Sequence, residues 1–542
     1  MKRTFVTVVC AMILSALLAP SAAAAPAAQS GRIPRFGQGP VGPYDRVNPD
    51  LTTELSVQDR GPGLDTGCTF NTTTPSLDFT VDVGRSLGVT TNGVPANLNQ
   101  LISNGYLAPK AKLRMLVYDV DDDRGEVDQV YFNNKPTPVG TFEGVNDRWK
   151  INTFIVDVRD VLFPDPGSFT SPPDKRANRV QVFIDVTNPG SGAWCTAVDW
   201  VTLELNTIAP LVLIHGTGAD NLAWTSTWVQ PPRIAAADYL DAQGVPFQVA
   251  RLNDPYATSY TNARDVYNWA LSTATNYGTD RVHVVGHSKG GLDARAYLRF
   301  IGTQQAVRPL SLHTIGTPHY GSLISTLSVI ARKNPSATSP DPNVNRFLNS
   351  YRQARTFSPL RFLVDCSAEV PRDPALSQLS WGGMTMFNRA VGESPPRDVF
   401  VRSYSGDADL NRDRRIQVNE AQPYITAECT RIRGLNTQFA DPEQVATNLY
   451  TLLRDFNSVT TEIIRRRGGQ TTTVTAQNDP TAVRRPIDND LLVTNDSATF
   501  SSNHRHFVGP TQGRNHPNLK DDQTMAAILT AIKLRFPVTR GN

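Results

Sequence analysis

Apolar and polar residues follow two different patterns along the chain, and the pattern changes near residue 206. Between residues 66 and 205, short segments repeat at every second position, as in Val180, Val182 and Ile184. A period of two is typical of β-strands that bury one face. No helical stretch of comparable strength interrupts these segments. We therefore predict an N-terminal all-β sandwich domain over residues 66–205.

After residue 206 the pattern changes to short apolar runs separated by amphipathic helices. The runs lie at residues 211–214, 247–252, 281–285, 312–315 and 399–404. The helix after the second run places Val266, Ala270 and Tyr277 on one face and ends before Gly278. Apolar strands that alternate with helices are typical of a mostly parallel sheet with helices on both faces. The pattern predicts an α/β domain over residues 206–542.

The first 25 residues resemble an export signal. Lys2 and Arg3 precede an apolar run at residues 5–18 and a small-residue stretch at 21–25. The run is too short to cross a membrane, and no later segment approaches eighteen consecutive apolar residues. Residues 26–65 are rich in Pro, Gly and Asp without periodicity, which indicates a linker or arm. We expect a secreted, extracellular protein without a membrane span.

The cysteine count fits an exported protein. Of the five cysteines, Cys10 lies in the signal, which leaves an even number. An even count in an exported chain favours disulfides, and four cysteines allow three pairings. Because one pair falls in each predicted domain, we predict Cys68–Cys195 and Cys366–Cys429. The formal net charge of +3 is close to neutral, so we expect no nucleic-acid partner.

The sequence Gly-His-Ser-Lys-Gly at residues 286–290 follows one of the apolar strands and precedes a helical stretch at 291–300. This G-x-S-x-G pattern, between a strand and a helix, is the context of a nucleophile elbow. The glycines allow a turn too tight for side chains, and the turn exposes a serine hydroxyl at the start of the helix. The motif predicts Ser288 as a nucleophile.

An oxyanion hole needs two backbone N–H groups aimed at the developing negative oxygen. The residue after the nucleophile, Lys289, supplies one such group. The second is expected from the loop after the first core strand, where His215-Gly216-Thr217-Gly218 offers the N–H of Thr217. We interpret His215 as a residue that packs the loop rather than as an acid or base.

Three of these segments together resemble the secreted bacterial triacylglycerol lipases and esterases of the α/β-hydrolase superfamily: His215-Gly216, residues 286–290 and Thr317-Pro318-His319. The resemblance covers residues 206–542 and not the β domain. It implies an α/β-hydrolase fold, a catalytic order of Ser, Asp and His, and frequently a calcium ion and a mobile lid.

The resemblance also guides the choice of the histidine and the aspartate. Of the eight histidines, only His504, His506 and His516 lie late enough in the chain. His516 stands in a Gly-Arg-Asn-His-Pro loop before a helix with one apolar stripe, and this placement matches the family. His506, and less so His504, is its rival.

For the acid, residues 488–493 resemble the Asn-Asp-x-Leu-Val segment that holds the lipase aspartate, which points to Asp490. The rival is Asp407, just after the strand at 399–404. The role of this aspartate would be to orient the imidazole.

Residues 409–420 follow the ligand spacing of a calcium-binding EF-hand loop. Oxygen ligands at positions 1, 3, 5, 7 and 12 favour calcium. Here they are Asp409, Asn411, Asp413, the carbonyl of Arg415, and Glu420. Arg414 replaces the glycine that normally makes the sharp turn. We predict a structural Ca²⁺ in this loop, which would occupy Asp409.

An insertion of more than eighty residues separates the strands at 312–315 and 399–404, and connections in such folds are usually far shorter. We predict that residues 322–397 form a helical cap over Ser288, either mobile or rigid. The expected substrate is a lipid or polyester, which a lipid–water interface can present. Another serine hydrolase on this fold, such as a thioesterase or peptidase, is an alternative, and an inactive secreted binding protein is a further one.

Overall fold

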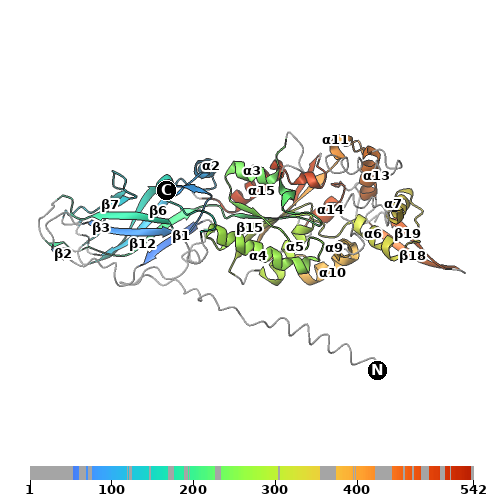
Figure 1. Ribbon diagram of the computed structural model, residues 1–542, viewed down its shortest axis with the longest axis horizontal. Helices are drawn as coiled ribbons and strands as arrows, with labels where there is room; N and C mark the ends of the chain where they lie inside the picture. Colours follow the sequence, from blue (N-terminus) through green and yellow to red (C-terminus); the bar gives the residue numbers. More distant parts are fainter. Residues whose placement is uncertain are drawn as a thin grey trace, which may run out of the picture.

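A computed structural model describes residues 53–59, 69–70 and 76–538 with internal gaps. The gaps fall at residues 119, 121, 123–124, 146–147, 169–175, 188–192, 195, 226–232, 303–305, 354–373, 395, 397, 422–441, 456–457, 467–468, 478–487, 501–506 and 513. Along the described residues, an N-terminal region of antiparallel strands precedes a region in which strands alternate with helices (Figure 1).

The N-terminal region contains two four-stranded antiparallel sheets. The first has the order β1 (Thr53–Asp59), β12 (Ala197–Asn206), β6 (Lys110–Tyr118) and β9 (Trp149–Asp157). The second has the order β3 (Ser76–Val83), β10 (Arg176–Phe183), β7 (Gln129–Phe132) and β8 (Gly140–Thr141). Side chains alternate between buried and exposed along β3 and β9, as a pleated strand with one buried face requires. Buried residues of both sheets, such as Leu113 and Val180, belong to one hydrophobic cluster.

Strand β1 lies inside the segment 26–65 that the composition predicts as a linker. Its seven residues pair antiparallel with β12, from Thr53 opposite Asn206 to Asp59 opposite Trp200. Composition predicted a linker or arm and did not reveal this strand, which a ladder of backbone hydrogen bonds places at the edge of a sheet. The rest of the segment, and the predicted signal at 1–25, lie outside the described residues.

The second region is built on a six-stranded sheet in which every neighbouring pair is parallel. Its order is β14 (Phe247–Val249), β13 (Leu211–Ile214), β15 (Arg281–His287), β16 (Arg308–Ile315), β17 (Phe400–Asp407) and β20 (Phe507–Gln512). The first five strands occur where the apolar runs predict them. Since all strands run the same way, their carboxyl ends meet at one edge of the sheet.

Helices cover both faces of this sheet, because successive side chains of a strand point to opposite sides. On β13, Val212 joins the cluster formed with α4 (Ser259–Tyr277) and α5 (Lys289–Phe300). Its neighbour Leu213 joins the cluster formed with α3 (Ala236–Gln243) and α15 (Asp522–Arg535). The second cluster also contains the buried residues of the N-terminal sheets. One continuous core therefore links the two regions.

Two insertions extend the carboxyl side of the sheet. The predicted cap at 322–397 contains α6 (Leu323–Lys333), α7 (Pro342–Gln353), α9 (Pro374–Leu379) and α10 (Trp381–Val391). A second insertion, which the sequence does not reveal, lies between β17 and β20. It contains α11 (Val418–Ala421), α13 (Pro442–Asp455), the hairpin of β18 (Ser458–Arg466) and β19 (Gly469–Gln477), and α14 (Asn495–Ala498). The two insertions share one core, in which Leu327 and Leu348 of the cap join Leu453 and Val474.

The remaining elements are short. They are β2 (Thr69–Phe70), β4 (Thr90–Thr91), β5 (Val94–Pro95), α2 (Leu98–Ser103) and β11 (Ala193–Trp194), and the 3-10 turns at Val158–Asp160, Asn221–Trp224 and Pro517–Leu519. Among the described helices, none has the length and apolar content needed to cross a membrane.

Candidate active site

Ser288 lies on a sharp turn between β15 and α5, at the carboxyl edge of the sheet. Its backbone is left-handed, with φ 55° and ψ −131°, which is strained for a residue with a side chain. The flanking glycines allow this turn. A Cβ on Gly286 would lie 2.6 Å from Gly291 Cα, and one on Gly290 would lie 2.5 Å from the carbonyl oxygen of His215. The local geometry is that of a nucleophile elbow.

The predicted oxyanion donors flank this serine. A Cβ on Gly216 would lie 2.7 Å from the Cβ of Ser288, so the Thr217 loop passes directly beside the nucleophile. Lys289 is the first residue of α5, and the first N–H groups of a helix have no acceptor within it. The Lys289 ammonium is buried and donates to both carboxylate oxygens of Asp293, at 2.9 Å each. The side chain therefore anchors the helix, and the backbone N–H of Lys289 is left without an acceptor inside the helix.

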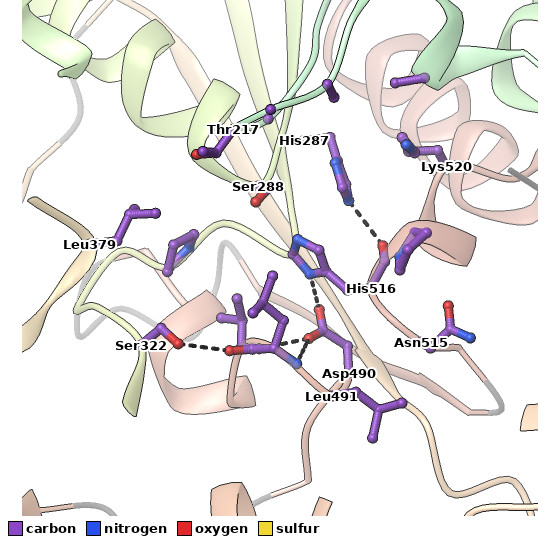
Figure 2. Close-up of a pocket in the computed structure, with 18 of the residues that line it drawn as sticks. Thr217, His287, Ser288, Ser322, Leu379, Asp490, Leu491, Asn515, His516 and Lys520 are labelled. Atoms are coloured by element: carbon purple, nitrogen blue, oxygen red, sulfur yellow. Dashed lines mark hydrogen bonds and ion pairs between the residues drawn. The ribbon is translucent and has the colours of Figure 1, made fainter. Parts of the chain in front are cut away.

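His516 and Asp490 form a close buried pair. The Nδ1 of His516 lies 2.7 Å from Oδ2 of Asp490, and the His516 backbone N–H donates to the Asp490 carbonyl at 2.8 Å. A carboxylate accepts, so Nδ1 carries the proton and Nε2 keeps its lone pair. This Nε2 is buried and has no hydrogen-bond partner in the described structure. Figure 2 shows Ser288 and the His516 ring facing each other across the pocket.

The Asp490 carboxylate is fixed by its own turn. Its Oδ1 accepts from the backbone N–H groups of Leu492 at 3.0 Å and Val493 at 2.7 Å. The turn is tight, because Leu491 has a left-handed φ of 74°. Gly316, with φ 54°, leaves room for the pair: a Cβ there would lie 3.0 Å from both Asp490 Oδ2 and His516 Nδ1. Backbone donors and close packing thus orient the carboxylate toward the imidazole.

These groups line one small cavity of about 150 Å³. Its lining is largely apolar and includes Leu379, Leu491, Leu492 and Val493. Figure 2 places Ser288, Asp490 and His516 around it, each from a different segment of the chain. The structure thus brings together the predicted nucleophile, base, acid and oxyanion loop.

Sequence reasoning missed two residues of this site. His287 lies with its ring 4.6 Å from that of His516, and its Nε2 is 2.9 Å from the His516 carbonyl, to which it donates. Burial, reinforced by Lys520, lowers the pKa of His287 well below its usual range, so its ring stays neutral. Lys520 also lines the cavity, and burial lowers its pKa to about 7. His287 stands inside the G-x-S-x-G motif, whereas no sequence signal marks Lys520.

The alternatives to this set fall elsewhere. Asp407 accepts from the Tyr450 hydroxyl at 3.0 Å and from the Asp409 backbone at 3.1 Å, and no bond joins it to His516. His215 accepts from the Leu252 N–H at 3.3 Å and therefore donates from Nδ1 to the Gly216 carbonyl at 3.0 Å, as expected of a loop-packing residue. The rivals His504 and His506 lie outside the described residues.

The carboxylates of the predicted calcium loop bond mainly to their own backbone. Asp409 accepts from the N–H groups of Asp413 at 3.2 Å and Arg414 at 2.8 Å. Glu420 accepts from Leu410 at 2.9 Å and Gln417 at 2.6 Å. Within the described part of the chain, no group of three or more His, Cys, Asp or Glu side chains is arranged to hold a metal ion.

Two features of the loop at residues 409–420 are consistent with the predicted EF-hand spacing. Arg414 has a left-handed φ of 67° at the position where an EF-hand loop turns on glycine. Burial, with the charges of Asp409 and Asp413, raises the pKa of Glu420. Asn411 and the side chain of Arg415 are exposed. The four cysteines Cys68, Cys195, Cys366 and Cys429 lie outside the described residues, so both disulfides stay predictions.

A parallel sheet in this order, with a strand–turn–helix elbow at its carboxyl edge, fits the α/β-hydrolase fold. No known family profile matches the sequence. No curated protein matches it either.

Several solved structures are similar to part of this chain. The Bacillus licheniformis lipase BlEst2 is 14% identical, over 60% of this chain and 91% of that chain, with a TM-score of 0.33. The Staphylococcus hyicus lipase is 14% identical over 60% of this chain and 95% of that chain, with a TM-score of 0.32. EstA from Clostridium botulinum is 15% identical over 58% of this chain and 83% of that chain, with a TM-score of 0.32. These scores are low, and the fold rests on the strand order and the elbow.

Proposed function

We propose that the protein is a serine ester hydrolase that cleaves carboxylic esters of lipids or polyesters through an acyl-enzyme. The observation that carries this proposal is the constellation at one edge of the sheet: Ser288 on a strained elbow, beside an imidazole whose Nδ1 is held 2.7 Å from the Asp490 carboxylate. A nucleophile, a base and an oriented third group are the parts that acyl transfer needs.

In the proposed mechanism, Ser288 Oγ attacks the ester carbonyl carbon as its proton passes to His516 Nε2. The carbonyl oxygen takes up negative charge and accepts hydrogen bonds from the backbone N–H groups of Thr217 and Lys289. Collapse of this intermediate transfers the proton from Nε2 to the departing alcohol and leaves an acyl-serine. Water, deprotonated by His516, then hydrolyses the acyl-enzyme and releases the carboxylic acid. Asp490 holds the imidazole tautomer and stabilises the imidazolium throughout.

The cavity suits an apolar acyl group of limited size. Its lining is mainly apolar, and its volume of about 150 Å³ equals that of a protein cavity that accepts benzene. In this conformation it accommodates a short acyl chain. The cap of the predicted range 322–397 reaches this cavity through Leu379 at the end of α9. A long chain therefore requires the cap to move.

A serine-reactive fluorophosphonate tests the proposal directly. We expect it to label the wild-type protein and not the Ser288→Ala variant, and p-nitrophenyl esters to be turned over by the wild type alone. Folded wild-type protein that is neither labelled nor active would instead support the inactive binding protein. Comparison of oxygen esters with thioesters and peptides of matched acyl group separates an esterase from a thioesterase or peptidase.

We also propose that calcium binds the loop at residues 409–420. The support is the ligand spacing, the left-handed turn at Arg414 and the negative charges of Asp409 and Asp413 that act on Glu420. Asp409, Asn411, Asp413, the Arg415 carbonyl and Glu420 would supply oxygen ligands after the carboxylates turn from their backbone donors. The ion would neutralise these carboxylates and stabilise the loop.

We further propose that the chain is exported and that its two N-terminal sheets form a β-sandwich domain. The support is the charged and apolar N-terminal segment, the even cysteine count and the buried cluster shared by the two sheets. Non-reducing peptide mapping of the protein from culture medium would locate the signal cleavage site and the pairs Cys68–Cys195 and Cys366–Cys429. A mature protein with four free thiols would contradict the pairing.

A further inference from the structure

A second cavity lies at the C-terminal end of α5 and shares no lining residue with the Ser288 pocket. Its volume is about 600 Å³, within the range of small-molecule sites. The end of α5, the end of α10 and the faces of β16 and β17 bound it, and Phe500 closes one side. Figure 1 shows α5 and α10 on the same side of the sheet. Nothing in the proposed reaction uses this cavity.

A buried arginine forms part of its wall. The Arg295 side chain is 4% exposed, and its guanidinium lies 4.2 Å from the ring centre of Phe500 and 5.3 Å from that of Phe387. Burial lowers the pKa of Arg295 to about 9. This shift shows how strongly the fold disfavours an isolated positive charge at this position.

The hydrogen bonds of Arg295 go only to neutral groups. One terminal nitrogen donates to His319 Nδ1 at 3.2 Å, and the other donates to Asn388 Oδ1 at 3.0 Å and to the Gly392 carbonyl at 2.7 Å. Its Nε is buried without a partner in the described structure. No described carboxylate bonds to the guanidinium. The charge of Glu393 offsets part of this burial, although no hydrogen bond joins it to the guanidinium in the described structure. Because a buried charge is expensive unless a hydrogen-bonded opposite charge accompanies it, this arrangement favours an anionic ligand.

Two further arginines point to the same chemistry. Arg299, one helical turn after Arg295, and Arg389 on α10 both line the cavity and are exposed. Glu393 is the only carboxylate among the described lining residues. The charges therefore favour an anion, while Leu312, Val401 and Phe500 offer it an apolar wall. Guanidinium groups match the planar, two-oxygen geometry of a carboxylate.

We infer that this cavity is a binding site for an organic carboxylate with an apolar body, such as a medium-chain fatty acid. The carboxylate would lie among Arg295, Arg299 and Arg389, and the apolar body would pack against the strands and Phe500. Such an acid could come from the proposed ester hydrolysis or from the surroundings, and the site requires only the shared chemistry. The inference itself rests on the cavity and its charges and not on the proposed esterase activity.

Titration calorimetry of the full chain with octanoate tests this inference. We expect one site to bind octanoate and to bind acetate or 1-octanol at least tenfold more weakly, because each lacks either the apolar body or the charge. Arg299→Gln/Arg389→Gln should weaken octanoate at least tenfold. Both positions are exposed, so this variant should fold. Arg308→Gln, an exposed arginine outside the cavity, is the matched control and should bind like the wild type.

Competition with a p-nitrophenyl ester separates the two cavities and the two proposals. Octanoate that binds only as a competitive inhibitor, with an affinity unchanged by Arg299→Gln/Arg389→Gln, would place it in the Ser288 pocket and overturn the inference. No octanoate binding to the folded protein would overturn it as well. Conversely, charge-dependent binding that persists in Ser288→Ala supports the site even if the chain lacks esterase activity. Octanoate hydrolysed from an ester and octanoate added freely should give the same occupancy.

Discussion

Two neighbouring turns at the carboxyl edge of the sheet present buried aspartates, and the two differ in where their hydrogen bonds go. The turns touch, since the Ala408 N–H donates to the Asn489 carbonyl at 2.9 Å. Asp490 directs one oxygen to His516 and holds the other with backbone N–H groups. Asp407 bonds to Tyr450 and to its own loop. An aspartate at the end of a sheet strand therefore does not by itself identify the catalytic acid. The hydrogen bonds of its carboxylate decide whether it can orient the imidazole.

The largest effect expected from this comparison is on turnover. Asp490→Asn should lower kcat about 10⁴-fold without unfolding the protein, because an amide favours the wrong imidazole tautomer. Asp407→Asn should change kcat less than tenfold, since its side chain bonds to Tyr450 and the Asp409 backbone and not to His516. Ester turnover and circular dichroism of both variants check this. The opposite ranking of the two variants would reassign the acid to Asp407.

The Asp490 turn also lines the cavity beside Ser288, which the Asp407 turn does not. Its lining residues are Leu491, Leu492 and Val493. We expect p-nitrophenyl butyrate to exceed the palmitate ester in kcat/KM by at least tenfold when both are monomeric. Val493→Ala should shift the preference several-fold toward longer chains by enlarging the cavity. Ile416→Val, a buried change in the other turn, serves as the control and should leave the ratio unchanged. A palmitate preference in the wild type would require an open cap.

The cap adds a further test to the same cavity. If the cap moves, hydrolysis of tributyrin should rise abruptly above its solubility limit, because an interface favours the open form. Smooth saturation across that limit would identify a rigid cap that only shapes the pocket.

The calcium proposal predicts that the two turns also differ in their response to chelation. Calcium at 100 times its Kd would stabilise the folded protein by about 2.7 kcal/mol, which for a chain of this size is a rise in Tm of roughly 2 to 4 °C. Glu420→Gln should remove this response, while Asp490→Asn should keep it. Thermal unfolding in millimolar calcium and in excess EDTA measures both. Equal melting temperatures for the wild type in the two buffers would exclude a stabilising ion in the loop.

Sequence patterns predicted the local parts of this site better than the distant ones. The apolar run at 281–285, the glycines and the following helix specify the elbow, because all of its determinants are close in the chain. The meeting of Asp490 with His516 was expected only through the resemblance to lipases. Contacts between remote segments, such as β1 with β12 or Arg295 with Phe500, leave no pattern in either segment alone. The hairpin of β18 and β19 was also not predicted, although its two strands are adjacent in the chain.

The smallest effect concerns the pH dependence of stability. Burial, with the charges of Asp488 and Asp409, raises the pKa of Asp407 to about 6 from its usual 3.8. Between these values the folded protein keeps a proton that the unfolded chain releases, so stability falls as pH rises through this window and stays lower above pH 6. The difference is on the order of 2 kcal/mol. Asp407→Asn cannot ionise and should lose less stability than the wild type between pH 4 and pH 7. Denaturant unfolding in EDTA across this range measures the difference without the ion. If the stability of variant and wild type changed equally with pH, the pKa of Asp407 would be normal. The two aspartates would then differ only in their hydrogen bonds.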